Sequence, residues 1–181
     1  MNNCVLFIQG GGDDGYEADK KLVASLHAAL GETYEVHYPE IPSDETVSDF
    51  GWPLQIGKEI ADIKGNVILV GHSLGASLLL KYLSENEIKK NIRAIFLIST
   101  PFWRGNEDWK QGLKLHKDFA SKLPKSVPIF LYHSMDDEEV PFDHLELYSQ
   151  NLLQATVREI ANGGHQLNND LTIVAKDIKS L

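Results

Sequence analysis

A serine between two glycines lies where a strand-like segment gives way to a helix-like one. The motif G-x-S-x-G occupies residues 71–75, with Ser73 at its centre, after the apolar run 66–70 and before the helical pattern 74–83. A serine in such a turn sits in strained backbone that pushes its hydroxyl clear of the sheet. The glycines two residues before and after it let strand and helix approach closely. The pattern predicts a nucleophile at Ser73, and a tight turn that uses glycine only for packing is the alternative.

A serine hydroxyl is a weak nucleophile unless a histidine base accepts its proton and a carboxylate orients that histidine. Both partners are available after later strand-like runs. Residues 133–141, with the sequence His-Ser-Met-Asp-Asp-Glu-Glu-Val-Pro, follow the fifth run, and His165 follows the sixth in an Asn-Gly-Gly-His loop. The remaining acids of the 133–141 loop are expected to be solvated. The chain therefore presents serine, acid and histidine in that order.

Short apolar runs alternate with longer helical patterns, which is typical of βαβ units and a parallel sheet. Six runs have strand length: 4–9, 34–38, 66–70, 92–99, 127–133 and 156–160. The runs 34–38 and 156–160 alternate or carry charge, which suits the edges of the sheet, whereas the other strands are more continuously apolar. Helices are expected over 18–30, 74–83, 145–153 and 171–178, and the stretch 47–63 is expected to begin as a loop.

The bulk composition restricts the class of protein. The chain has 181 residues, 43% of them hydrophobic, and a formal net charge of −9. This length predicts one domain over residues 1–181. The negative charge disfavours nucleic acid or anionic membranes as partners. The single cysteine, Cys4, rules out an internal disulfide and fits a reducing compartment. With no signal-peptide pattern and no long apolar run, a cytoplasmic protein is expected; the oligomeric state stays open.

With these residues in view, the chain resembles the α/β-hydrolases, most of all the compact bacterial serine hydrolases that have little or no cap. The resemblance extends over nearly the whole chain. The family pattern D-x-x-V-P falls on residues 137–141, so it implies Asp137, rather than Asp136, as the third catalytic residue beside Ser73 and His165. It also implies a three-layer α/β/α sandwich whose central, mostly parallel sheet has about six strands in the order 2-1-3-4-5-6.

The resemblance further implies the oxyanion-binding groups. Residues 9–12, Gln-Gly-Gly-Gly, end the first strand, where members of this family usually have His-Gly. Because the expected donors are backbone amides, the N–H groups of Gly11 and Leu74 are predicted to form the oxyanion hole. Gln9 in place of the histidine makes the shape of the loop uncertain rather than its role. No metal or organic cofactor is expected.

The predicted reaction is hydrolysis of a small acyl substrate, most simply a carboxylic ester, with thioesters and amides as chemical alternatives. Residues 101–123, the longest connection without a strand, are too short for a large lid, so an open site is expected. Four residues are candidates for contact with substrate: Gly10, His72, Trp103 and Trp109.

Two other classes of function are compatible with the sequence. One is a hydrolase-shaped binding protein in which the three residues persist without catalysis. The other is a nucleotide-binding protein, because Gly10, Gly12 and Gly15 satisfy G-x-G-x-x-G between a strand and a helix. Asp13 and Asp14 speak against it, since they would bring negative charge to the place of a pyrophosphate.

Overall fold

One twisted, six-stranded parallel sheet organises the protein, and the computed structural model describes residues 3–181 of it. The strand order is β2-β1-β3-β4-β5-β6, and each neighbouring pair is parallel. The strands are β1 (Asn3–Ile8), β2 (Tyr34–His37), β3 (Val67–His72), β4 (Ile92–Ile98), β5 (Ile129–Ser134) and β6 (Thr156–Ile160). The predicted fold class and strand order are confirmed.

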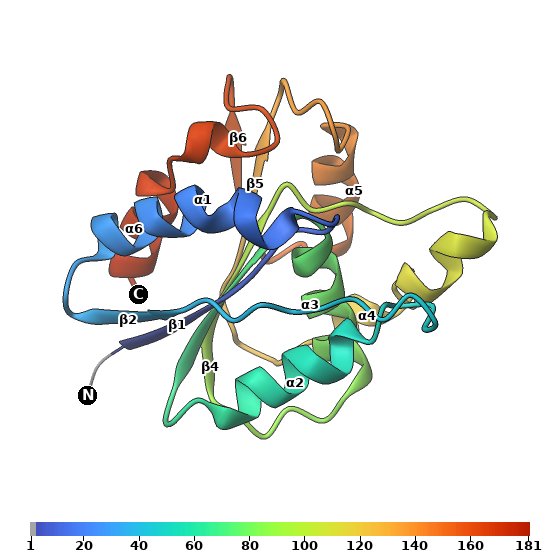
Figure 1. Ribbon diagram of the computed structural model, residues 1–181, viewed down its shortest axis with the longest axis horizontal. Coiled ribbons are helices and arrows are strands. Elements are labelled where there is room, and N and C mark those ends of the chain that lie inside the picture. The colour runs from blue at the N-terminus through green and yellow to red at the C-terminus, as the bar shows by residue number, and fades with distance from the viewer. Residues whose placement is uncertain (1–2) are drawn as a thin grey trace.

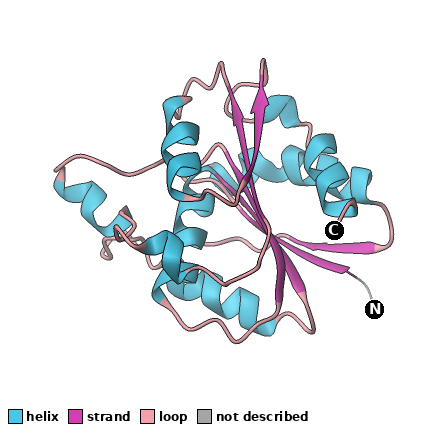
Figure 2. Ribbon diagram, turned by 180° about the vertical axis from the view of Figure 1, so that it is seen from behind, coloured by secondary structure: helices cyan, strands magenta, loops and turns pink. Residues whose placement is uncertain are grey.

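Helices cover both faces of this sheet, which gives three layers (Figures 1 and 2). They are α1 (Gly15–Leu30), α2 (Trp52–Asp62), α3 (Ser73–Glu85), α4 (Phe119–Lys122), α5 (Asp143–Asn151) and α6 (Thr172–Lys179). Two short 3₁₀ helices span Asp108–Leu113 and Leu167–Asn169. Helices α1 and α6 lie side by side on one face, with α2, α3, α4 and α5 on the other. The stretch 47–63 does begin as a loop, because Gly51 adopts a left-handed conformation immediately before α2.

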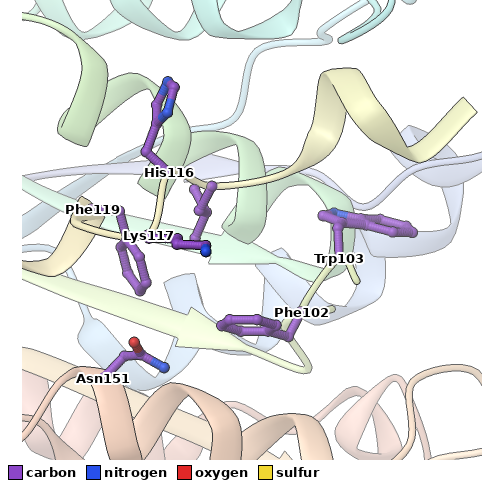
Figure 3. Close-up of a pocket in the computed structure, with 7 residues that line it drawn as sticks. Phe102, Trp103, His116, Lys117, Phe119 and Asn151 are labelled. Carbon is purple, nitrogen blue, oxygen red and sulfur yellow. The ribbon is translucent and has the colours of Figure 1, made fainter. Parts of the chain in front are cut away.

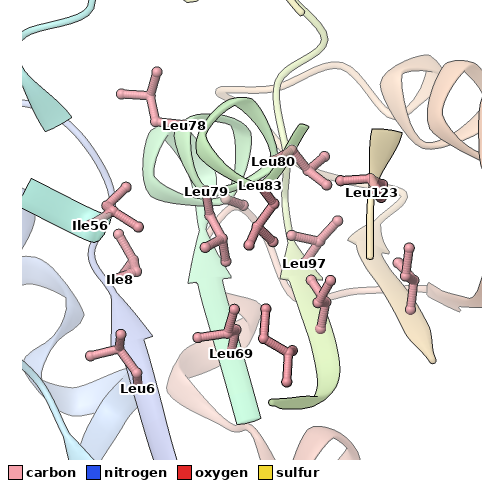
Figure 4. Packing of buried hydrophobic residues seen from close by; sticks show 14 of the residues in the cluster. Leu6, Ile8, Ile56, Leu69, Leu78, Leu79, Leu80, Leu83, Leu97 and Leu123 are labelled. Carbon is pink, nitrogen blue, oxygen red and sulfur yellow. The ribbon is translucent and has the colours of Figure 1, made fainter. Parts of the chain in front are cut away.

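The apolar core forms two layers, one on each side of the sheet. Along β1, Leu6 and Ile8 face α2 and α3, whereas Val5 and Phe7 face α1 and α6. Figure 4 shows the leucines of α3 packed onto Leu69 and Leu97 of the central strands. Strands β2 and β6 alternate between half-buried and exposed residues and form the two edges, as their sequences predict. Across the described residues, no helix combines the length and the hydropathy that crossing a bilayer would require.

The carboxyl ends of β1 and β3 lie next to each other at the point where the chain reverses its direction of connection along the sheet. Open α/β sheets bind their ligands at this kind of position. The loop after β1 carries Gly11, and the turn after β3 carries Ser73. The two segments that the sequence selects for chemistry are thus brought to one place by the topology of the sheet.

Candidate active site

Ser73 lies in a tight turn between β3 and α3 whose backbone is strained. Its φ is 50°, a left-handed value that a residue with a side chain rarely adopts. The flanking glycines are required by space: a Cβ on Gly71 would lie 2.6 Å from Cα of Ala76, and one on Gly75 would lie 2.1 Å from the Gln9 carbonyl oxygen. The turn therefore has the strain and close packing expected of a nucleophile-bearing strand-to-helix connection.

The two predicted oxyanion donors lie together beside Ser73. Leu74 is the second residue of α3, where a backbone N–H has no acceptor within the helix. Gly11 packs directly on Leu74, since a Cβ on Gly11 would come within 2.6 Å of the leucine side chain. Gln9 is buried, and its side-chain oxygen accepts a hydrogen bond from the Ile41 N–H at 2.8 Å. The residue that departs from the usual pattern thus anchors the loop to the segment after β2.

Asp137 and His165 form a close pair. The His165 Nδ1 lies 3.0 Å from Asp137 Oδ1 and 2.9 Å from Oδ2, and the Asp137 side chain is fully buried. Oδ1 also accepts the N–H groups of Glu139 and Val140, at 2.9 and 2.8 Å. Burial alone would raise the pKa of Asp137, but hydrogen bonds from His133, His165 and the two amides outweigh it and hold the pKa well below its usual range. Asp137 is therefore a carboxylate that orients the His165 ring.

The neighbouring acids contact the histidine loop rather than the ring. Asp136 Oδ1 accepts the N–H groups of Gly163 and Gly164, both at 2.9 Å, and Glu138 Oε2 accepts the His165 N–H at 3.1 Å. The Ser134 hydroxyl and the two glycine amides lower the pKa of Asp136 to about 2. The expectation of merely solvated acids is therefore wrong for Asp136 and Glu138, which are exposed yet bind the backbone around His165.

A cleft of about 490 Å³ opens over Ser73 and His165, and Gly11 and Leu74 also line it. No direct hydrogen bond joins Ser73 to His165 among the described side chains, and such bonds often tighten only when substrate is present. Trp103 and Trp109, predicted as pocket residues, both line this cleft and pack edge to face with ring centroids 5.7 Å apart. The segment 101–123 thus supplies an aromatic wall.

Trp103 also borders a second hollow, of about 310 Å³, on its other side. Figure 3 shows Trp103 and Phe102 across this hollow from Phe119, with His116 and Lys117 along its rim. The Trp103 indole N–H donates to the Ser77 hydroxyl at 3.0 Å, which holds the ring in place. The indole ring therefore separates the two spaces.

Two residues predicted to contact substrate do not line the cleft. His72 is 1% exposed, and its two ring nitrogens are bonded to Asp19 and to the His165 carbonyl oxygen. Gly10 is buried, and its N–H donates to Asp19 at 2.7 Å. The expected substrate contacts of His72 and Gly10 are therefore corrected: strand β3 ends in a conformation that directs the His72 side chain inward, toward α1.

The glycine-rich loop is also poorly suited to a nucleotide. A pyrophosphate needs free backbone N–H donors, but the Gly10 N–H is already bonded to the buried Asp19 carboxylate. Asp13 and Asp14 are exposed at the start of α1 and would repel a phosphate group. The three glycines are explained by packing instead, since a Cβ on Gly15 would lie 2.4 Å from the Gly10 carbonyl oxygen.

Residues 25–171 match the family described as "Serine hydrolase", so the chain belongs to that family. It has an α/β-hydrolase fold. Among curated proteins, it is similar to the "Putative hydrolase YdeN" of Bacillus subtilis (strain 168), with 28% identity over 110 residues. That match covers 58% of this chain and 56% of the relative, so the chain spans little more than half the length of the curated protein it matches.

Solved structures with the same fold include Arabidopsis thaliana SOBER1, with 18% identity, a TM-score of 0.70 and 99% of both chains covered. The esterase EaEST from Exiguobacterium antarcticum has 15% identity and a TM-score of 0.70, over 99% of this chain and 91% of the esterase. Est1E from Butyrivibrio proteoclasticus has 15% identity and a TM-score of 0.68, over 99% of this chain and 86% of Est1E. At these identities the likeness establishes the fold.

Proposed function

We propose that this protein is a serine hydrolase that cleaves small carboxylic esters, with Ser73 as nucleophile, His165 as base and Asp137 as the orienting acid. The observation that carries the proposal is the short contact of His165 Nδ1 with a fully buried carboxylate, on a histidine that lines the same cleft as Ser73. A carboxylate on Nδ1 selects the tautomer whose Nε2 can accept a proton.

In the proposed reaction, His165 Nε2 takes the Ser73 proton while Oγ attacks the carbonyl carbon. The N–H groups of Gly11 and Leu74 stabilise the negative charge that develops on the carbonyl oxygen, where one such donor contributes about 3 kcal/mol. His165 then protonates the leaving alcohol as the acyl–oxygen bond breaks. A water molecule, deprotonated by the same histidine, attacks the acyl-enzyme, and its proton returns to Ser73 as the acid leaves.

The size of the cleft supports a small acyl group. A volume of about 490 Å³ falls at the lower end of the range for small-molecule sites. The cleft is bordered by Trp103 and Trp109, of which Trp109 is 60% exposed. Esters are the first choice because an alcohol leaves more readily than an amine; thioesters meet the same groups and form the second choice.

The proposal is tested by intact-mass analysis after treatment with a fluorophosphonate probe, followed by peptide mapping of the adduct. We expect one adduct per chain, on Ser73, and turnover of p-nitrophenyl acetate by the untreated protein. Heat-denatured protein serves as the control and is expected to remain unlabelled, because an isolated serine is not activated. Folded protein that takes up no probe would favour a non-catalytic binding protein instead.

A substrate-size prediction follows from the position of Trp103 between the two hollows. Trp103→Ala is expected to join the cleft to the space beside Phe102 and Phe119, and to raise kcat/KM for p-nitrophenyl octanoate relative to acetate by about 10-fold. Trp109→Ala is the matched control, because Trp109 lines the cleft but not the second hollow. An acyl-length preference that changes equally in both variants would contradict this assignment.

A further inference from the structure

A second acid–histidine pair lies behind the proposed catalytic residues. Asp19 of α1 and His72 at the end of β3 are each 1% exposed, and His72 Nδ1 lies 2.9 Å from Asp19 Oδ2. The His72 ring is tilted 46° to the His165 ring, with centroids 4.9 Å apart. The pair lies outside the cleft, so it does not touch substrate.

The surroundings of His72 define its protonation. Its Nδ1 faces a carboxylate and its Nε2 faces the His165 carbonyl oxygen at 3.1 Å, and both of these partners only accept hydrogen bonds. Both contacts are satisfied together only when each ring nitrogen carries a hydrogen. Burial alone would raise the pKa of the Asp19 carboxyl, but the hydrogen bond and charge of His72, with the Gly10 N–H, lower it below its ordinary value. An Asp19 carboxylate paired with a His72 imidazolium fits all these contacts.

One carboxylate oxygen connects the pair to a second part of the site. Asp19 Oδ2 accepts the Gly10 N–H at 2.7 Å as well as the His72 Nδ1–H. Gly10 directly precedes Gly11, whose N–H is a proposed oxyanion donor. On the other side, the His165 carbonyl oxygen accepts from His72 and, at 3.0 Å, from the buried Ser99 hydroxyl. A single network therefore runs from the oxyanion loop to the main chain of the proposed base.

We propose that Asp19 and His72 are positioning residues that fix the backbone of His165 and the oxyanion loop relative to each other. The proposal rests on the function proposed above. Asp137 holds the ring of His165 through Nδ1, but a ring can still shift if its main chain moves. His72 and Ser99 hold that main chain from the opposite side, which keeps Nε2 directed toward Ser73 in the cleft. Misplacement of a reacting group by about 1 Å can cost about 100-fold in rate.

The first test is Asp19→Asn. The side-chain atom that replaces Oδ2 can accept from both Gly10 and His72 or donate to one of them. As an oxygen it leaves a neutral His72 without a hydrogen for the His165 carbonyl, and as a nitrogen it opposes the Gly10 N–H. We expect kcat for p-nitrophenyl acetate and the rate of fluorophosphonate labelling to fall about 10- to 100-fold, with KM changed less than threefold.

Two replacements of His72 separate the links. The amide nitrogen of glutamine lies near the place of Nε2, so His72→Gln keeps a donor for the His165 carbonyl. The amide nitrogen of asparagine lies near the place of Nδ1, so His72→Asn keeps a donor for Asp19 only. We expect His72→Gln to retain at least tenfold more activity than His72→Asn at a similar melting temperature. Equal activity of the two folded variants, or full activity of Asp19→Asn, would overturn the positioning role.

Asp177→Asn is the matched control for loss of a buried carboxylate network. Asp177 accepts hydrogen bonds from Tyr132 and Arg158 but contacts no residue of the cleft. It is expected to lower the melting temperature without changing kcat. Wild-type protein that is not labelled at all would remove the proposed function, and the positioning role with it, whereas labelled wild type with unaffected Asp19 and His72 variants would remove only the positioning role.

A readout independent of catalysis is the ¹H–¹⁵N NMR spectrum of histidine-labelled wild-type protein, with His72→Gln used for assignment. Two protonated ring nitrogens on His72 are expected. One protonated and one free nitrogen would contradict the network described above.

Discussion

Ser73→Ala is expected to reduce kcat for p-nitrophenyl acetate by about 10⁶-fold and to abolish fluorophosphonate labelling, which is the largest effect that we predict. The reason is that covalent catalysis ends when Oγ is removed, so that only the oxyanion donors and substrate binding remain. The melting temperature is expected to stay within a few degrees of the wild-type value, because alanine fits the same strained turn and every packing contact of Gly71 and Gly75 is kept.

Ser84→Ala is the matched control. Ser84 is a buried serine of the same helix, its hydroxyl donates to the Lys81 carbonyl oxygen, and it does not line the cleft. We expect full activity and full labelling in this variant. Esterase turnover that survives in Ser73→Ala, after purification from the host's own esterases is verified, would assign the nucleophile to another residue.

The second largest expected effect is that of Asp137→Asn, which should lower kcat about 10⁴-fold. The hydrogen bonds around Asp137 define the orientation of the new amide. Because the N–H groups of Glu139 and Val140 both donate to Oδ1, the asparagine oxygen must take that position. The NH₂ group then faces His165 Nδ1 in the place of Oδ2. It donates to Nδ1 and selects the tautomer with hydrogen on Nε2, which cannot accept the Ser73 proton.

Asp136→Asn is the control that distinguishes the adjacent acids. Asp136 is exposed and binds the Gly163 and Gly164 amides through Oδ1, contacts that an asparagine oxygen can retain. We expect less than a tenfold loss of kcat in this variant. Steady-state kinetics of both variants, with circular dichroism to verify folding, make the comparison. A larger loss in Asp136→Asn than in Asp137→Asn would reverse the assignment of the acid.

The loop that carries His165 is held at many points. Asp136 and Glu138 bind its backbone N–H groups, His72 and Ser99 bind the His165 carbonyl, and Asp137 binds the ring. Three successive residues after it, Leu167–Asn169, have positive φ values, a strained backbone that persists only where the surroundings fix it. The density of contacts around one short loop is what a precisely placed base requires.

Much of the fold could be predicted from the sequence because its signals are local. The apolar runs of β1, β3 and β4 are continuous because both faces of those strands are covered, and the runs of β2 and β6 alternate because they are edges. Gly71 and Gly75 mark the turn at Ser73 because neither place has room for a Cβ. The ends of elements were less well predicted: α1 begins at Gly15, three residues earlier than its apolar pattern indicates.

The sequence by itself determined which residue types follow which strand, and so placed Ser73, the acidic loop and His165 at one edge of the sheet. Only the tertiary structure decided how they connect. Asp136 and Asp137 are neighbours of the same type, and the course of the loop decides which one meets the ring of His165. Asp19 and His72 are 53 positions apart and bear no common motif. Local backbone preference and burial can be inferred from neighbouring residues, whereas a hydrogen bond between distant side chains depends on how helices and loops pack around the finished sheet.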